Sequence, residues 1–159
     1  MARRFVPGGL LRVFLLAVVC AGAARADGHA AAGAAGSCTL VVHVTGVRNQ
    51  KGVVGGALFT SADGWPEDES KSFAHGPFPI TGNTATLTFG HLPAQRYGVV
   101  VLHDENSNKK LDRNFLGVPK EGFGFANNPR VLLSAPSIDK AWVNVTCPVT
   151  DTSIRLIYK

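Results

Sequence analysis

Apolar and polar side chains alternate along several short segments of the chain. In residues 38–45 every second side chain is apolar, and in residues 84–89 the same holds for Ala85, Leu87 and Phe89. A strand points successive side chains to opposite faces, so this pattern indicates strands with one face against a core. Further strands are predicted at residues 53–60, 97–102, 130–134, 141–147 and 152–158.

Residues 97–102 are apolar without interruption, which is typical of a central strand that is covered on both faces. No segment keeps a helical period over several turns. About seven short strands with Gly- and Pro-rich connections therefore predict an all-β fold, a single antiparallel β-sandwich.

The first residues have the pattern of a secretory signal peptide. Arg3 and Arg4 precede an apolar stretch at residues 10–19, and Ala24 and Ala26 supply the small side chains of a cleavage site. A retained N-terminal anchor is the alternative, but the stretch is shorter than the ~20 residues that span a bilayer. We expect a signal peptide at residues 1–26, a flexible Ala/Gly-rich tether at 27–37 and the sandwich at 38–159. The mature chain then has no transmembrane span, and it is periplasmic or extracellular.

Export changes how the charge and the cysteines are interpreted. The chain has 16 basic and 11 acidic residues, a net charge of +5, but without residues 1–26 only 12 basic residues remain against the same 11 acidic ones. A nucleic-acid partner is therefore not expected. The cysteines left are Cys38 and Cys147, and an oxidising compartment favours a disulfide between them, with both thiols on apolar strand faces. Two buried free thiols are the alternative.

A long connection at residues 103–129 contains an oxygen-rich loop. Short side chains with oxygen atoms stand at positions 1, 3, 5 and 9 of a D-x-N-x-N-x-x-x-D pattern, and they are Asp104, Asn106, Asn108 and Asp112. The backbone carbonyl of Lys110, at position 7, adds another oxygen. Ca²⁺ prefers such oxygen ligands, and Glu121 is a further candidate if the loop folds back. Lys109 stands where this type of loop has Gly, which requires a left-handed backbone, so weak Ca²⁺ binding is one expectation and metal-free Asx turns are the other.

Aromatic residues of this connection, and of a second long one at residues 61–82, have two interpretations. Phe115, Phe123, Phe125 and Trp65 either form a binding surface for a glycan, peptide or partner domain, or pack the loops onto the sandwich. His103, which precedes two carboxylates, is the only candidate for acid–base chemistry that the loop offers.

Three segments resemble the bacterial domain-of-unknown-function family 2141: LPAQRY at residues 92–97, HDENSNKKLD at 103–112 and LGVPKEGFGFANN at 116–128. The similarity covers residues 39–158. It implies an exported bacterial protein with a prealbumin-like or immunoglobulin-like sandwich and no assigned reaction. The oxygen-rich loop is also similar to Ca²⁺-binding loops in B-type repeats of bacterial surface proteins.

We therefore expect a non-enzymatic β-sandwich module of the bacterial cell envelope. Its loop is ordered by Ca²⁺, and its aromatic loops bind an envelope protein or a glycan. The alternative is a small periplasmic hydrolase that uses His103 and the neighbouring carboxylates.

Overall fold

The computed structural model describes residues 37–132 and 134–159. The predicted signal peptide, and all of the predicted tether except Ser37, lie outside the described residues. Nine strands form two sheets, and the helical turns of the described residues are the short 3₁₀ helices η1 (Glu69–Lys71) and η2 (Ile138–Lys140). Within these ranges no helix has the length and apolar character needed to cross a lipid bilayer.

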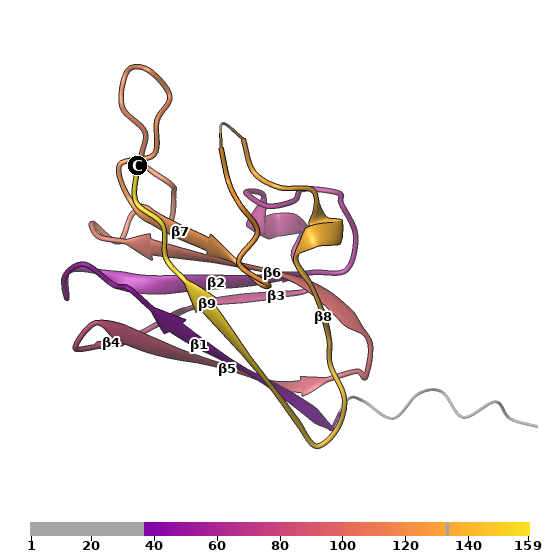
Figure 1. Cartoon of the computed structure of the whole chain (residues 1–159). Helices are drawn as coiled ribbons and strands as arrows, with labels where there is room; N and C mark the ends of the chain where they lie inside the picture. Colours follow the sequence, from indigo (N-terminus) through magenta and orange to yellow (C-terminus); the bar gives the residue numbers. More distant parts are fainter. Residues whose placement is uncertain (1–36, 133) are drawn as a thin grey trace, which may run out of the picture. The chain divides into compact units, whose positions relative to one another are not determined.

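The first sheet has the strand order β4-β5-β1-β9 (Figure 1). Its strands are β4 (Ile80–Thr81), β5 (Thr84–Leu92), β1 (Cys38–Thr45) and β9 (Val149–Arg155). β1 pairs antiparallel with β5 and parallel with β9. The expected sandwich was antiparallel throughout, and the β1–β9 pair corrects that expectation.

The second sheet has the order β3-β2-β6-β7, and β8 also pairs with β6. Its strands are β3 (Ala74–Phe78), β2 (Val53–Phe59), β6 (Arg96–Asp104), β7 (Gly122–Phe125) and β8 (Trp142–Asn144). Every pair in this sheet is antiparallel. β6 lies inside the sheet, as the apolar run at residues 97–102 predicted.

The main core lies between the two sheets. The alternating positions that the sequence assigned to the core are buried in β1 and β5, which confirms the predicted facing of both strands. They pack against the inward side chains of β2 and β6. Burial of these side chains stabilises the fold by roughly 1.5–3 kcal/mol for each large aliphatic residue. The largest buried aliphatic side chains are Leu40, Val42, Val44, Val54, Leu58, Leu87, Leu92, Val99 and Ile154.

Several predicted strand boundaries were wrong. The described residues of 130–134 form no strand, 141–147 shortens to β8, and 152–158 is replaced by β9 at 149–155. The strands β3, β4 and β7 lie in segments that were expected to be loops. β7 was missed because its sequence, GFGF, places glycines on the inner face, where Gly124 lies against Ile154 and no apolar side chain signals a core.

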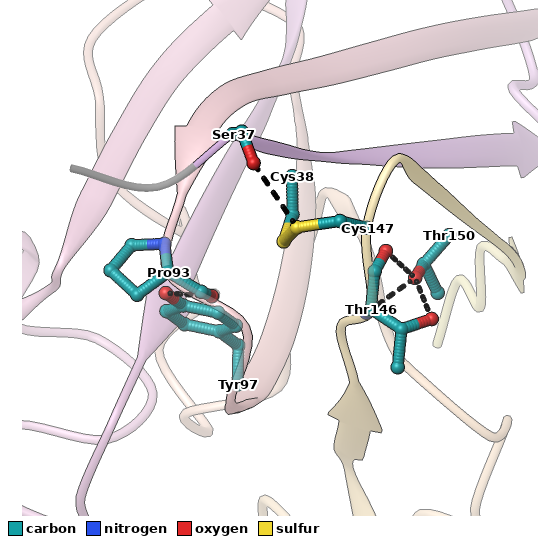
Figure 2. Close-up of a disulfide and its surroundings, with 7 residues drawn as sticks. All are labelled: Ser37, Cys38, Pro93, Tyr97, Thr146, Cys147 and Thr150. Carbon is teal, nitrogen blue, oxygen red and sulfur yellow. Dashed lines mark hydrogen bonds between the residues drawn. A yellow bond between two sulfur atoms is a disulfide. The ribbon is translucent and has the colours of Figure 1, made fainter. Parts of the chain in front are cut away.

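A disulfide joins Cys38 to Cys147, as predicted, and links positions 109 residues apart. The disulfide links the start of β1 to the turn before β9 (Figure 2). Cys38 is fully buried, whereas Cys147 is exposed. Only one of the two cysteines therefore lies in the core, because β8 ends at Asn144 before it reaches the second one. Thr150 Oγ1 closes this turn by donating to the carbonyl of Thr146 at 3.1 Å.

Candidate functional site

The sheet of β2, β6 and β7 is apolar on its outer face as well as on its core face. Val100 and Leu102 of β6 point outward, next to Phe123 and Phe125 of the adjacent β7. Phe123 and Phe125 pack in a second cluster with Ala141 and Val131, outside the main core. Three connecting segments lie on this side of the sheet (Figure 1), at residues 60–73, at residues 105–121 and, in its described parts, at residues 126–132 and 134–137. A second apolar surface, apart from the main core, therefore lies on this side of the sheet.

Asp104, the first predicted ligand, is buried and faces the backbone of its own loop. Its Oδ1 accepts the N–H of Asn108 at 3.0 Å, and its Oδ2 accepts the N–H of Lys109 at 2.7 Å. Lys109 has φ +63°, the left-handed conformation that a lysine at the Gly position was expected to need. The loop thus adopts the backbone turn that this pattern requires.

The next three predicted ligands converge. Asn106 Nδ2 and Asn108 Nδ2 donate to the two oxygens of the Asp112 carboxylate, at 2.8 and 3.0 Å. The amide oxygens accept backbone N–H groups instead, that of Asn106 from Asn108 and that of Asn108 from Lys110. The loop is therefore closed by its own Asx-type hydrogen bonds. In the described part of the chain, no group of three His, Cys, Asp or Glu side chains is arranged to hold a metal.

Glu121 fastens the loop to itself. Its side chain is only 4% exposed, and its two oxygens accept the backbone N–H groups of Glu105 and Asp112 at 2.9 and 3.0 Å. Lys120 donates its N–H to the carbonyl of Asp112 at 2.8 Å, so the loop does fold back as the sequence analysis required. Both carboxylate oxygens of Glu121 therefore bind backbone N–H groups, and the residue links the two ends of the loop.

His103 is fully buried, and both of its ring nitrogens are hydrogen-bonded. Nε2 lies 2.9 Å from the carbonyl of Lys51, which can only accept, so Nε2 carries the hydrogen. Nδ1 lies 2.7 Å from the hydroxyl of Tyr158, which donates to it, and the hydroxyl in turn accepts the N–H of Arg48 at 3.1 Å. Burial raises the pKa of Tyr158 above its ordinary value, although Arg48 opposes the shift.

Glu105 contacts a basic side chain from the β1–β2 connection. Arg48 Nε donates to Glu105 Oε1 at 2.6 Å, and Asn49 Nδ2 donates to Oε2 at 3.0 Å. Burial alone raises the pKa of Glu105, but the hydrogen bonds from Asn49 and Arg48, together with the charge of Arg48, outweigh it and hold the pKa below its ordinary value. The loop is thus tied to a second connection of the sheet.

The predicted aromatic residues separate into two groups. Phe123 and Phe125 are buried, and Trp65 is half-buried, with its Nε1 donating to the carbonyl of Pro136 at 2.9 Å and its ring 5.6 Å from that of Phe125. Phe115 is 95% exposed at the tip of the 113–119 turn. Among these four, only Phe115 presents a whole ring to solvent.

A groove of about 590 Å³ opens on the outer face of the sheet, between these segments. Its floor includes Gly55 and Leu102, and its walls carry Leu116, Val118 and Leu132, which are 71%, 37% and 64% exposed. No pattern in the sequence predicted the groove. A signal was present in Gly55, a glycine inside a predicted strand, because such a glycine often marks a close approach by a ligand or another backbone.

Comparison with known families gives one finding. The sequence profile of a family described as an uncharacterized protein conserved in bacteria (DUF2141) matches residues 42–153. This range includes most of both sheets and the whole 104–121 loop. No curated protein matches the chain, and no solved structure matches it.

Proposed function

We propose a function from the premise that the chain belongs to the bacterial family DUF2141, whose description assigns no reaction. The protein is a non-enzymatic β-sandwich module, immunoglobulin-like or prealbumin-like in type, that is exported to the cell envelope. It presents the loops on the outer face of the second sheet to an envelope protein or a glycan. The observation that carries this proposal is the exposure of apolar side chains on these loops, with Phe115 at the tip.

The environment of His103 supports a binding role over hydrolysis. A general base must reach the proton that it removes, but this imidazole has no exposed surface and both of its nitrogens are engaged. The neighbouring Asp104 is buried as well and accepts backbone N–H groups. These groups act in holding the loop, and a catalytic role for them would need the loop to open.

The exposed ring of Phe115 supports recognition by contact. The turn that carries it is ordered by Asn114, whose Oδ1 accepts the N–H groups of Leu116 and Val118 at 2.9 and 3.0 Å. An aromatic side chain held on an ordered turn loses little conformational freedom when it binds, and such residues contribute a large share of interface energy.

The experiment is co-sedimentation of the purified protein with isolated bacterial envelope fragments. Phe115→Ser should lower the affinity about thirtyfold or more, because a central aromatic contact contributes ~2 kcal/mol or more. Val149→Ser is the matched control, since Val149 is 51% exposed on β9, close to the disulfide. Equal affinities of the wild type and Phe115→Ser would contradict the proposal.

We also propose that the loop binds Ca²⁺ weakly, with Kd ~10⁻⁴–10⁻³ M. The ligands are Asp104, Asn106, Asn108, Asp112 and the carbonyl of Lys110. The convergence of Asn106 and Asn108 on Asp112 supports this, although their amides must turn their oxygens toward the ion. The Tm should then rise by a few degrees in millimolar Ca²⁺, and Asp112→Asn should abolish the increase. An identical Tm with Ca²⁺ and with a chelator would refute the ion site.

A further inference from the structure

The groove beside the loop has the dimensions and chemistry of a small-molecule site. Its volume of about 590 Å³ lies within the ~300–1,000 Å³ range of small-ligand pockets. The floor is the outer face of β2, β6 and β7. The walls are the turn at residues 113–119 and, before η2, residues 131–132 and 134–135. Leu116 and Leu132 remain mostly exposed in these walls. Apolar side chains grouped in this way mark a surface that a ligand covers.

The depth of the groove depends on a missing side chain. Gly55 lies on the floor, and a Cβ added there meets only the carbonyl oxygen of Leu102, at 3.9 Å. Its neighbour Gly56 is different, because a Cβ there would lie 2.4 Å from Leu87 in the core. Packing against the core therefore accounts for Gly56, while at Gly55 the only consequence of the glycine is open space above the sheet.

The charges at the groove favour an anionic group on the ligand. Lys109, Lys110, Arg113 and Lys159 line it together with two glutamates. Arg113 pairs with Glu67, and Lys159 Nζ donates to the carbonyl of Val131 at 2.8 Å. The ion pairs of the described residues include neither Lys109 nor Lys110. Among the described residues that line the groove, Glu69 is the one carboxylate side chain in none of these pairs, so the two ammonium groups exceed it by one positive charge beside the apolar surface.

Two other classes of ligand fit the groove poorly. An extended peptide that adds to a sheet needs a free strand edge, but β6 is flanked by β2 and by β7 and β8. β7 ends the sheet, and on its outer edge Phe123 exchanges two backbone hydrogen bonds with Ile157, at 3.1 and 2.8 Å. A glycan usually stacks on an exposed aromatic face, but the rings of Phe123 and Phe125 in the floor are 7% and 4% exposed. Phe115 is not part of the lining.

We propose that the groove binds a fatty acid, whose alkyl chain lies on the floor above Gly55 and whose carboxylate lies beside Lys109 and Lys110. This goes beyond the envelope contact proposed for Phe115, and the two fail independently. Phe115→Ser changes the tip without altering the groove lining, and a change at Gly55 alters the groove without altering the tip.

The test is isothermal titration of the purified protein with saturated fatty acids below their aggregation concentration. Binding should be one to one, and each added methylene should lower Kd about fourfold until the groove is filled. Gly55→Val should weaken binding about ten- to a hundredfold by filling the floor. Gly90→Val is the matched control, since Gly90 is a strand glycine whose added Cβ meets nothing within 4 Å.

The head group and the wall are tested separately. A Lys109→Gln/Lys110→Gln variant should weaken binding of the acid about three- to tenfold and leave the alcohol of the same chain length unaffected. Leu132→Glu, at an exposed position, serves as a second blocking variant should Gly55→Val fail to fold. The proposal would be overturned if the wild type showed no saturable binding, or if Gly55→Val and Leu132→Glu bound the acid as tightly as the wild type does. Equal affinities of the wild type for the acid and for the alcohol would also overturn it. So would a wild-type dimer that Leu132→Glu dissociates, because the groove would then be a contact between two copies of the chain.

Discussion

Glu121 offers a direct test of how the 104–121 loop is held. The substitution Glu121→Gln keeps the volume and shape of the side chain but replaces one carboxylate oxygen by an NH₂ group. In the wild type each oxygen accepts a backbone N–H, from Glu105 at 2.9 Å and from Asp112 at 3.0 Å. The amide of the variant can accept only one of these N–H groups, so the other N–H faces the donor NH₂ group. Water cannot easily replace the lost acceptor, because residue 121 is only 4% exposed.

The magnitude follows from these two contacts. A hydrogen bond to a charged acceptor contributes ~1.5–3 kcal/mol, and an unsatisfied buried N–H costs a further ~1–3 kcal/mol. Because the loop can relax or admit water, we expect the free energy of unfolding to fall by about 2–4 kcal/mol. For a domain of this size the Tm should fall by about 10 °C.

The assay is urea unfolding at pH 7, followed by far-UV circular dichroism and compared at equal m-values. The matched control is Glu69→Gln, since Glu69 is exposed on η1 and makes no side-chain hydrogen bond or ion pair among the described residues. The control should lie within ~0.5 kcal/mol of the wild type. A Glu121→Gln variant as stable as this control would refute the reasoning, because it would mean that the buried carboxylate does not hold the loop.

Three further predictions concern the loop, its ion pair and the disulfide. Lys109→Gly should raise the free energy of unfolding by ~0.5–1 kcal/mol, because glycine relieves the cost of φ +63°. Lys110→Gly is the control and should lower the free energy of unfolding. Equal changes in the two variants, measured by urea unfolding, would contradict this prediction. Since the pKa of Glu105 is held below its value in the unfolded chain, the stability it contributes is present above pH ~4.5 and is lost as the pH falls through the folded pKa. Arg48→Ala should therefore destabilise the protein more at pH 7 than at pH 3, and a pH-independent difference in unfolding free energy would count against the pair. Replacing both Cys38 and Cys147 by Ala should cost about 4–5 kcal/mol, since the bridge closes a loop of 109 residues, and a loss below ~1 kcal/mol would show that the bridge contributes little.

The local pattern of the sequence was enough to place the strands that have one face in the core. β1 begins and ends at the predicted residues, and the inward positions of β5 are those that alternation assigned. The Asx turns of the loop were also predictable, because a short oxygen-bearing side chain reaches a backbone N–H only a few residues away. The disulfide followed from there being only two cysteines beyond the predicted leader.

Contacts between distant segments were decided by the tertiary structure alone. The parallel pairing of β1 with β9 and the burial of Glu121 each depend on which segments become neighbours. Alternation cannot report this, because it records only whether one face of a strand is apolar and does not show what covers that face.

The groove is the clearest case. Gly55, Leu116 and Leu132 come from three separate segments, and among them only Gly55 carried a signal in the sequence, as a glycine inside a predicted strand. They line one cavity only because β2 pairs with β6 and two loops stand over that sheet. The sequence by itself determined the strands with one face in the core and the turns of the loop, which depend on local geometry. It also determined the bridge, because only two cysteines follow the predicted leader. The tertiary structure decided the groove, because the groove exists only where non-adjacent segments meet.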